Sequence, residues 1–445
     1  MQSYWCDLAW LGGDTALAGV LVEVDSVGSI SSVTEGVARP SDAYRLPGLT
    51  LPGMANTHSH AFHRAVRGRT QAGIGSFWTW REQMYEAAAR LDPDSYFRLA
   101  RATYGEMVLA GITCVGEFHY VHHGPGGVRY GNPNAMGEAL VAAAAEVGLR
   151  LTLLDTCYLH GGIGVEPNEV QMRFSDGDGS SWASRASAMK ATDLCRVGAA
   201  IHSVRAVDPA TIELVAAWAQ HHGVPLHAHV SEQPAENDQC LAAHGLTPVA
   251  LLAARGALEA SFTAVHVTHA TEGDIGLLGG SGSTVCICPT TERDLADGIG
   301  RARALRDAGA TLALGTDSHA VIDIFEEARA VELDERLASL VRGSHDAPSL
   351  LRAATSHGYE SLGWVGGGLL RPGAPADLVS VRLDSVRTAG CSPATALETV
   401  VFAATAADVH NVLVGGEVVV SDGRHRSIDV AAELAAAIGD LMDSA

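Results

Sequence analysis

The feature that most constrains the fold is a series of eight short segments between residues 49 and 319, most of them rich in Val, Ile, Leu, Thr and Ala. They are Leu49–His60, Gly111–His119, Arg150–His160, Gly198–Val207, Pro225–Glu232, Phe262–Ala270, Thr284–Thr291 and Thr311–His319. Apolar runs of this length are typical of strands buried in a parallel sheet. Helical patterns lie between many of them, for example over Asp92–Leu109, Asn134–Val147, Asp208–His222 and Glu292–Ala308. Strands that alternate with helices indicate an α/β fold, and eight such units favour a closed (β/α)8 TIM-like barrel.

The two ends of the chain follow a different pattern. Residues 1–47 and 376–425 alternate short apolar runs with Gly and Ser, and the second stretch contains a Gly-Gly turn signal. We therefore expect a small β-sandwich domain formed by the N- and C-terminal segments, residues 1–48 and 370–425, beside a barrel of residues 49–369. Ser349–Leu362 is expected to be helical, and residues 426–445 are expected to form a C-terminal helix over Asp429–Met442.

Composition limits the class of partner. Of the 445 residues, 47% are hydrophobic and 18% are charged, which excludes disorder or a coiled coil for most of the chain. The formal net charge of −21 disfavours nucleic acid and anionic membrane as partners. The chain shows no signal peptide and no apolar run long enough to span a membrane, so a cytoplasmic protein is expected. Eight scattered cysteines without a C-x-x-C pair predict buried free thiols.

Polar side chains capable of chemistry cluster at the carboxyl ends of the expected strands. They are His58, His60, His119, Arg205, His229, Glu232, His266, His269, Asp317 and His319. Because a TIM barrel carries its active site at this face, the pattern predicts a catalytic site there.

Three motifs in this set favour a metal ion. Thr57-His58-Ser59-His60 places two imidazoles on one face of a strand, because residues i and i+2 point the same way. His227-Ala228-His229 ends a second strand, and Gly315-Thr316-Asp317 ends the last one. Each motif alone could be structural, but three histidines and one aspartate together suit Zn²⁺ or another borderline divalent ion.

Two further residues suit hydrolysis beside such an ion. A divalent ion with an open position lowers the pKa of bound water towards about 7, and the proton must then reach a leaving group. Glu232, one short turn beyond His229, is placed to carry it, and His266 is a candidate donor to the developing charge. His269, which lies three residues after His266, is interpreted as a capping or packing residue.

The sequences PGMANTHSH, HAHVSE, VHVTHA and LGTDSH resemble the amidohydrolase superfamily. Its deaminase branch implies one metal ion held by His58, His60, His229 and Asp317. The resemblance also implies Glu232 and His266 as catalytic proton shuttle and electrophilic partner, with Asp317 helping to accept the water proton. Binuclear branches use a carboxylated lysine on the fourth strand, whereas the only lysine here, Lys190, precedes that strand. One ion is therefore expected, Zn²⁺ first and Fe²⁺ as the alternative.

A narrower similarity is carried by HAFHRAVRG, SFWTWREQMY, GEFHYVHH, HSVRAV, CPTTERDLADGIG and GTDSHAVIDIFEE. These segments are similar to the formimidoylglutamate deiminase family. That family implies hydrolysis of N-formimidoyl-L-glutamate to N-formyl-L-glutamate and ammonia, in bacterial histidine degradation, by a homodimer.

The dicarboxylate substrate of that family calls for cationic and hydroxyl donors. Arg205 has the fork geometry for a carboxylate, and Arg81 and Tyr120 match the family's other carboxylate-binding positions. His63 stands where the family has glutamine, and both His63 and His266 are expected to contact substrate. Arg81, expected in a loop with two tryptophans, could instead be a stacked surface arginine, and Tyr120 could be wall packing.

Two other functions remain open. A deaminase of the same branch acting on a purine or pyrimidine would need aromatic stacking and few arginines, which Arg81 and Arg205 disfavour. A non-catalytic scaffold with the same barrel is disfavoured because the expected ligands and Glu232 are all present.

Overall fold

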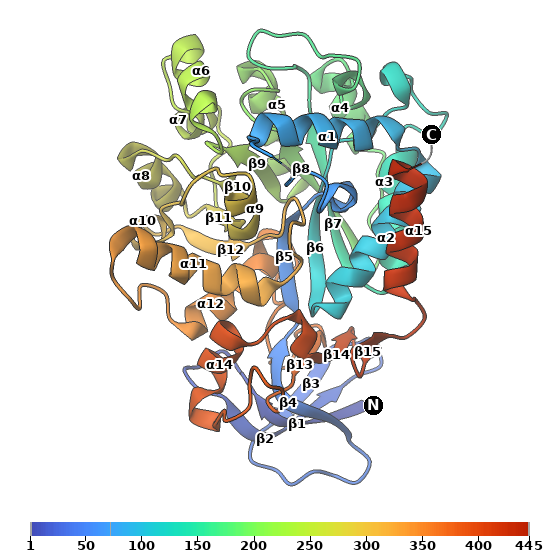
Figure 1. Cartoon of the computed structure of the whole chain (residues 1–445), viewed down its shortest axis with the longest axis vertical. Helices are drawn as coiled ribbons and strands as arrows, with labels where there is room; N and C mark the ends of the chain where they lie inside the picture. The colour runs from blue at the N-terminus through green and yellow to red at the C-terminus, as the bar shows by residue number, and fades with distance from the viewer. Residues whose placement is uncertain (1, 72, 444–445) are drawn as a thin grey trace.

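A computed structural model describes residues 2–71 and 73–443, and one of its two eight-stranded sheets is a parallel barrel (Figure 1). The barrel strands are β5 (Met54–Ser59), β6 (Ile112–His119), β7 (Arg150–Cys157), β8 (Cys195–Ile201), β9 (Leu226–Val230), β10 (Phe262–His266), β11 (Thr284–Ile287) and β12 (Thr311–Leu314). Each pairs in parallel with the next along the chain. A single bridge between Ser59 and Asp317 joins the first barrel strand to the last. The predicted TIM-like barrel is confirmed.

The first expected strand divides between two sheets. Its opening residues complete β4 (Tyr44–Pro52), which belongs to the terminal sheet, and the remainder forms β5. Gly53 lies at the turn, where its N–H donates to the carbonyl of Asp377 at 2.7 Å. A Cβ on this residue would lie only 2.1 Å from the Thr113 hydroxyl oxygen. The two sheets therefore approach each other too closely for a side chain at this point.

Four of the expected helices form as the sequence indicates. They are α2 (Pro93–Leu109), α3 (Ala135–Val147), α5 (Pro209–His222) and α15 (Val430–Met442). The side chains of Asp92, Asp208 and Asp429 accept hydrogen bonds from the first backbone N–H groups of α2, α5 and α15. Such N-caps satisfy donors that the helix itself leaves unpaired.

Two local expectations are wrong, and one is met except at a single break. Glu292–Ala308 spans two short helices, α9 (Pro289–Asp294) and α10 (Ala302–Asp307), because Ala296 and Gly298 adopt positive φ angles between them. Ser349–Leu362 is interrupted at Thr355, between α12 (Ala347–Ala354) and α13 (Ser356–Ser361). The segment around Arg81 is not a loop but helix α1 (Phe77–Arg90), which begins with a capping box formed by Ser76 and Thr79.

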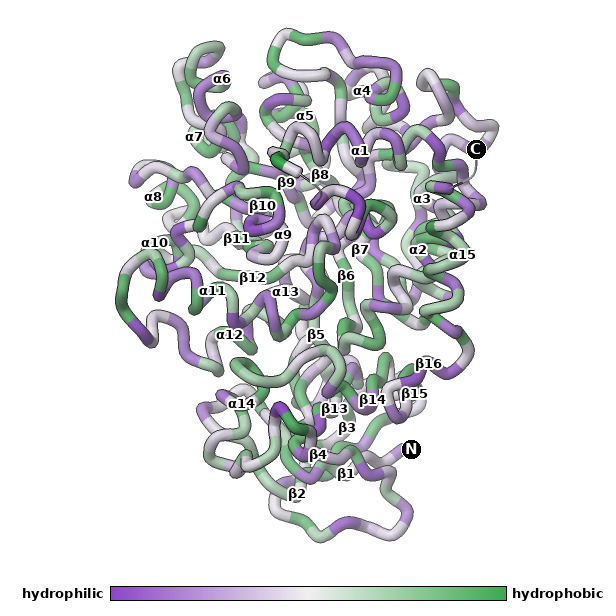
Figure 2. Tube along the Cα trace, in the orientation of Figure 1, coloured by the Kyte–Doolittle hydropathy of each residue, from purple (hydrophilic) through white to green (hydrophobic). Residues whose placement is uncertain are grey.

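The other helices complete the outer layer. They are α4 (Gly179–Ala186), α6 (Pro234–His244), α7 (Pro248–Ala254), α8 (Glu272–Ser281), α11 (Ile324–Ser339) and α14 (Ala396–Ala403), with the short 3₁₀ helix η1 (Ala61–Val66) after β5. Figure 1 shows α1 crossing above the barrel strands and α15 lying along α2. Hydrophobic residues follow the barrel strands, as Figure 2 shows for β6, whereas the surrounding helices alternate between hydrophobic and hydrophilic residues.

The two termini build one hydrogen-bonded sheet below the barrel (Figure 1). Its order is β16-β15-β14-β13-β4-β1-β2-β3, with β1 (Gln2–Ala9), β2 (Leu17–Val24), β3 (Ile30–Thr34), β13 (Leu378–Val381), β14 (Val409–Val414), β15 (Glu417–Ser421) and β16 (Arg424–His425). Strand β4 pairs in parallel with β1 and antiparallel with β13. The expected terminal β domain is thus connected as a continuous eight-stranded sheet.

A buried ion pair ties this sheet to the barrel. The Arg150 guanidinium at the start of β7 donates to both carboxylate oxygens of Asp377, at 2.7 and 3.1 Å. All eight cysteines are free, and seven of them are buried, as expected. Among the described residues, no helix combines the length and apolarity needed to cross a membrane.

Candidate metal centre and active-site cavity

Four of the predicted residues meet at the carboxyl end of the barrel. His58 and His60 lie at the end of β5, His229 lies in β9, and Asp317 follows β12. All four side chains are buried. Asp317 adopts a positive φ of 40°, a backbone state that non-glycine residues rarely occupy. The turn after β12 therefore holds its carboxylate toward the histidines at some conformational cost.

Four of the separations between these side chains are close to those between neighbouring ligands of one ion. The Nε2 atom of His229 lies 3.1 Å from that of His58 and 3.3 Å from that of His60. Asp317 Oδ1 lies 3.3 Å from His58 Nε2 and 3.4 Å from His60 Nε2. Zinc–nitrogen bonds of about 2.0–2.1 Å in tetrahedral geometry place neighbouring ligand atoms about 3.3 Å apart.

The hydrogen bonds of two rings orient their other nitrogens in a way that suits a cation. His60 Nδ1 lies 2.9 Å from the carbonyl of Phe118, and His229 Nδ1 lies 2.9 Å from the carbonyl of His202. Because a carbonyl only accepts, both Nδ1 atoms carry hydrogens, and in neutral rings both Nε2 atoms present lone pairs. Burial lowers the pKa of His60 to about 3, which keeps the ring neutral. Two lone pairs facing each other at 3.3 Å fit a divalent ion.

Other potential ligands surround this set. His266 Nε2 lies 3.7 Å from Asp317 Oδ2, and His63 approaches His60 and Asp317 closely enough to share a metal position with them. Lys190 is exposed on the loop before β8 and does not line the cavity.

The expected acid–base residues lie beside the histidines. Glu232 Oε1 is 3.8 Å from His266 Nε2, and the other ring nitrogen of His266 is 3.3 Å from Glu292. Burial lowers the pKa of His266, but the charges of Glu232, Glu292 and Asp317 outweigh it and hold the pKa well above the usual value. Burial raises the pKa of Glu232, although the charges of His266 and Arg205 oppose that shift.

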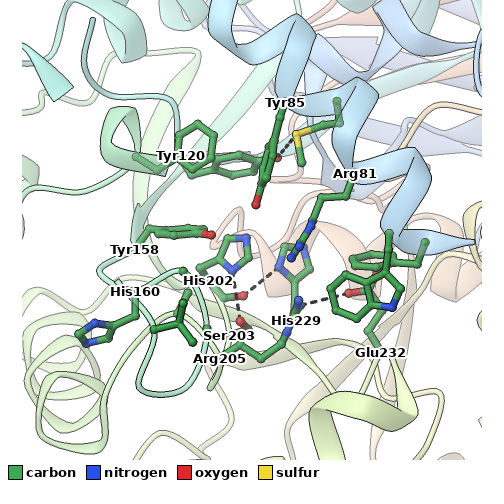
Figure 3. Close-up of a pocket in the computed structure, with 18 of the residues that line it drawn as sticks. Arg81, Tyr85, Tyr120, Tyr158, His160, His202, Ser203, Arg205, His229 and Glu232 are labelled. Atoms are coloured by element: carbon green, nitrogen blue, oxygen red, sulfur yellow. Dashed lines mark hydrogen bonds and ion pairs between the residues drawn. The ribbon is translucent and has the colours of Figure 1, made fainter. Parts of the chain in front are cut away.

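Arg205 is held by two carboxylates. Its Nη2 lies 3.4 Å from Glu232 Oε2 (Figure 3), and its Nε lies 3.2 Å from Glu236 Oε2. Both carboxylates are buried. Sequence reasoning assigned Arg205 to a substrate carboxylate, and the structure shows that protein carboxylates already compensate its charge.

A cavity of about 620 Å³ opens onto these groups. Figure 3 shows Arg81 extending from α1 into it, while Tyr120 and Tyr158 line the opposite wall. The Arg81 guanidinium stacks 4.5 Å from the centre of the Trp78 ring, so it is both stacked and directed into the cavity. The Tyr120 hydroxyl is buried and lies 2.9 Å from His63 Nε2.

Some strand-end residues stay outside the cavity. His119 contacts His122 at 3.3 Å behind the wall, His269 is half-buried at the start of the loop after β10, and His319 bonds to Ser59 and Thr316. None of the three lines the cavity.

Conversely, sequence reasoning did not single out three cavity residues, His202, Ser203 and Tyr158. His202 and Ser203 directly follow β8, and Tyr158 directly follows β7, so their strand-end position was the available signal.

An eight-stranded parallel barrel with three histidines and an aspartate at its carboxyl face defines a metal-dependent hydrolase of the amidohydrolase type. The chain belongs to the amidohydrolase family, whose model matches residues 49–419. It is 36% identical to the formimidoylglutamate deiminase of Pseudomonas aeruginosa over 438 residues, covering 95% of this chain and 96% of that protein.

Two other relatives show the breadth of the match. A 5-methylthioadenosine/S-adenosylhomocysteine deaminase of Natronomonas pharaonis is 29% identical over 388 residues, covering 86% of this chain and 84% of that protein. The crystal structure of an amidohydrolase from Brucella melitensis superposes with a TM-score of 0.92 at 32% identity, covering 99% of this chain and all of that chain. The resemblance to the amidohydrolases seen in the sequence motifs is confirmed.

Proposed function

We propose that this protein hydrolyses N-formimidoyl-L-glutamate to N-formyl-L-glutamate and ammonia. The relative from Pseudomonas aeruginosa, which is 36% identical and aligns over nearly its whole length, is named for this activity. The observation that carries the proposal is the cavity, because proposed metal ligands and two arginines both line it. His60, His229 and Asp317 line one part of it, and Arg81 and Arg205 line another. A small dicarboxylate with a reactive amidine group needs both.

The two arginines differ in their availability. Arg205 already pairs with Glu232 and Glu236, whereas Arg81 makes no ion pair with any carboxylate of the described residues. Arg81 is therefore the cation best placed to take a substrate carboxylate, with the Tyr120 hydroxyl as a further donor. His63, bonded to that hydroxyl, orients it.

The metal ion is assigned to His58, His60, His229 and Asp317, and Zn²⁺ suits this ligand set best, with Fe²⁺ as the alternative. Such an ion makes hydroxide available near neutral pH when it is bound. Asp317 and Glu232 are the carboxylates that line the cavity, so they receive the proton that the attacking water loses.

The remaining steps are assigned to Glu232 and His266. Water adds to the formimidoyl carbon, and the bond from that carbon to the terminal nitrogen then breaks. Glu232 delivers the proton to this nitrogen, which leaves as ammonia, and the His266 ring donates to the charge that develops during addition. The 3.8 Å between Glu232 Oε1 and His266 Nε2 supports this pairing, with Glu232 on the cavity wall and His266 buried directly behind it.

Ammonia release tests the proposal directly. The metal-loaded protein is offered N-formimidoyl-L-glutamate, N-formimidoyl-glycine, N-formimidoyl-aspartate and guanine at equal concentration. We expect the glutamate derivative to have the highest kcat/KM, because the glycine compound lacks the second carboxylate, the aspartate compound is one methylene shorter, and guanine has no carboxylate to reach Arg81. Absence of turnover with this compound would overturn the substrate assignment and leave the metal site standing.

A nucleobase or nucleoside is the second candidate substrate, because the cavity wall is aromatic. Phe77, Trp78, Trp80, Tyr85, Tyr120, Tyr158 and Phe174 all line it. Aromatic side chains of this kind stack on flat bases. The Natronomonas relative that is 29% identical to this chain is named for 5-methylthioadenosine and S-adenosylhomocysteine. Faster deamination of 5-methylthioadenosine than of N-formimidoyl-L-glutamate would favour this alternative.

A further inference from the structure

The barrel has a seam between its first and last strands. Strands β5 and β12 stand at opposite ends of the hydrogen-bonded order, and among the described residues only the bridge between Ser59 and Asp317 pairs them. The Asp317 N–H donates to the carbonyl of His58 at 3.0 Å. Gly315 lets the strands approach, because a Cβ there would lie 2.8 Å from the Cβ of His58. The segments that carry three of the four proposed ligands therefore meet with little backbone pairing.

Five side chains form a hydrogen-bonded chain across this seam, which we call the seam network. They are Asn56, Ser59, Glu117, Thr316 and His319, and each is fully buried. The Ser59 hydroxyl donates to Glu117 Oε2 at 2.8 Å, and His319 Nε2 lies 3.1 Å from the same hydroxyl oxygen. His319 Nδ1 lies 2.9 Å from the Thr316 hydroxyl. None of the five lines the active-site cavity.

With Glu117 as the acceptor, the donors and acceptors of the network follow in one arrangement. Because the Ser59 hydroxyl gives its hydrogen to Glu117, its oxygen accepts from His319 Nε2–H. His319 Nδ1 is then the acceptor of the Thr316 hydroxyl hydrogen. Asn56 completes the link, since its amide nitrogen donates to the Thr316 hydroxyl at 2.7 Å and its oxygen accepts from the Thr316 N–H at 2.9 Å.

The network touches both ligand-bearing segments without touching the ligand atoms. Glu117 binds on either side of His60, through the Ser59 hydroxyl and through the Ala61 N–H at 2.7 Å. Thr316 immediately precedes Asp317. Loss of one link leaves buried polar atoms unpaired and frees the two segments to move relative to each other.

We propose that Ser59 and His319 are positioning residues for the metal ion, because their hydrogen bond across the seam holds the two histidines of β5 and Asp317 at ligand spacing. This inference rests on the metal site assigned above. Hydrogen bonds made directly to metal ligands change metal affinity by about 10- to 100-fold when they are removed, and the seam network acts one step further out, on the backbone that carries the ligands. The seam network therefore sets how tightly the centre retains its ion and in what geometry.

Zinc binding by the whole protein tests the inference. The apoprotein of the parent and of Ser59→Ala is titrated with Zn²⁺ against a chromophoric chelator, and Co²⁺ is added to a second sample to record its visible spectrum. We expect Ser59→Ala to bind Zn²⁺ about 10- to 100-fold more weakly. We also expect its Co²⁺ bands to shift, because the ligand geometry changes.

Thr113→Val is the matched control. The Thr113 hydroxyl makes a buried 2.7 Å hydrogen bond to the Tyr359 hydroxyl, near the start of β6 at the opposite end of the barrel. This variant loses a comparable buried hydrogen bond, so its unfolding midpoint should fall by a similar amount as in Ser59→Ala. Its Zn²⁺ affinity and Co²⁺ spectrum should match those of the parent.

The possible outcomes distinguish failure of the positioning role from failure of the metal site itself. Zn²⁺ affinity of Ser59→Ala within threefold of the parent, with an unchanged Co²⁺ spectrum, overturns the inference alone. A parent protein that binds neither ion overturns the metal site and the inference together. If Ser59→Ala does not fold, His319→Asn is measured in the same way, because asparagine tolerates the φ of 58° at that position.

Discussion

Replacement of Glu232 by glutamine should remove turnover while leaving the fold and the metal in place. The amide fills the volume of the carboxylate but cannot accept the proton that the attacking water loses. Proton transfer by a positioned side chain contributes about 10²- to 10⁴-fold to rate. Glu232 is assigned two successive transfers, and Asp317, the other carboxylate that lines the cavity, is assigned to the metal. We therefore expect kcat to fall about 10³- to 10⁴-fold, equivalent to about 4–5.5 kcal/mol of transition-state stabilisation.

Substrate binding should change much less in this variant. Arg205 keeps its second partner, because its Nε lies 3.2 Å from Glu236, so the guanidinium stays in place when the charge of Glu232 is lost. KM for N-formimidoyl-L-glutamate should remain within about threefold of the parent value. Steady-state kinetics and metal analysis of the purified variant check both statements, since metal content should equal that of the parent.

Glu236→Gln is the matched control for Glu232→Gln. Glu236 is equally buried and also pairs with Arg205, but it does not line the cavity. Its replacement should raise KM more than it lowers kcat, since its carboxylate contacts Arg205 and the backbone N–H of Ser231 but is not assigned a proton transfer. If Glu232→Gln retained kcat within tenfold of the parent at full metal content, or if both variants lost the same kcat, the proton-shuttle role would be refuted.

Three further predictions concern the metal, the substrate and the link between the sheets. Chelation should abolish activity and lower the thermal midpoint, because an ion at about 1,000 times its Kd adds about 4 kcal/mol to stability; full activity of a metal-free sample would contradict this. Arg81→Met should raise KM for N-formimidoyl-L-glutamate about 10- to 100-fold at constant kcat, as expected for one charged hydrogen bond, and an unchanged KM in steady-state kinetics would exclude Arg81 from the substrate site. Arg150→Met should cost about 3–5 kcal/mol in urea unfolding, because it leaves Asp377 as a buried charge without its partner. Arg45→Met, which removes an exposed pair with Asp7, should cost less than about 1 kcal/mol, and equal losses would contradict the argument.

Much of the barrel could be predicted because its signals are local. The strand segments are short apolar runs, and an aspartate before Pro93 or Pro209 indicates a helix start that the structure confirms. The errors have local causes as well. The helix expected over Glu292–Ala308 breaks at Ala296, whose positive φ is imposed by the surrounding loop and is not visible in its residue type.

The two histidine pairs illustrate why spacing alone does not settle a ligand set. His227 and His229 point to the same side of β9, but they are about 6.6 Å apart along the strand. His227 therefore lies one layer deeper, where its Nε2 is 3.1 Å from the carbonyl of Ser361. His58 and His60 both reach Asp317, because β5 ends at Ser59 and the chain turns at His60.

The sequence by itself determined the order of strands and helices, the face of the barrel that carries polar residues, and the residue types suited to a divalent ion. These properties depend on periodicity and on neighbours within a few positions. Only the tertiary structure decided that neighbouring ligand atoms from strands far apart in the sequence come within 3.1–3.4 Å, that Arg205 is already paired, and that Ser59 meets His319 across the seam. Such contacts join residues up to 260 positions apart, so they depend on how the barrel closes and not on any local pattern.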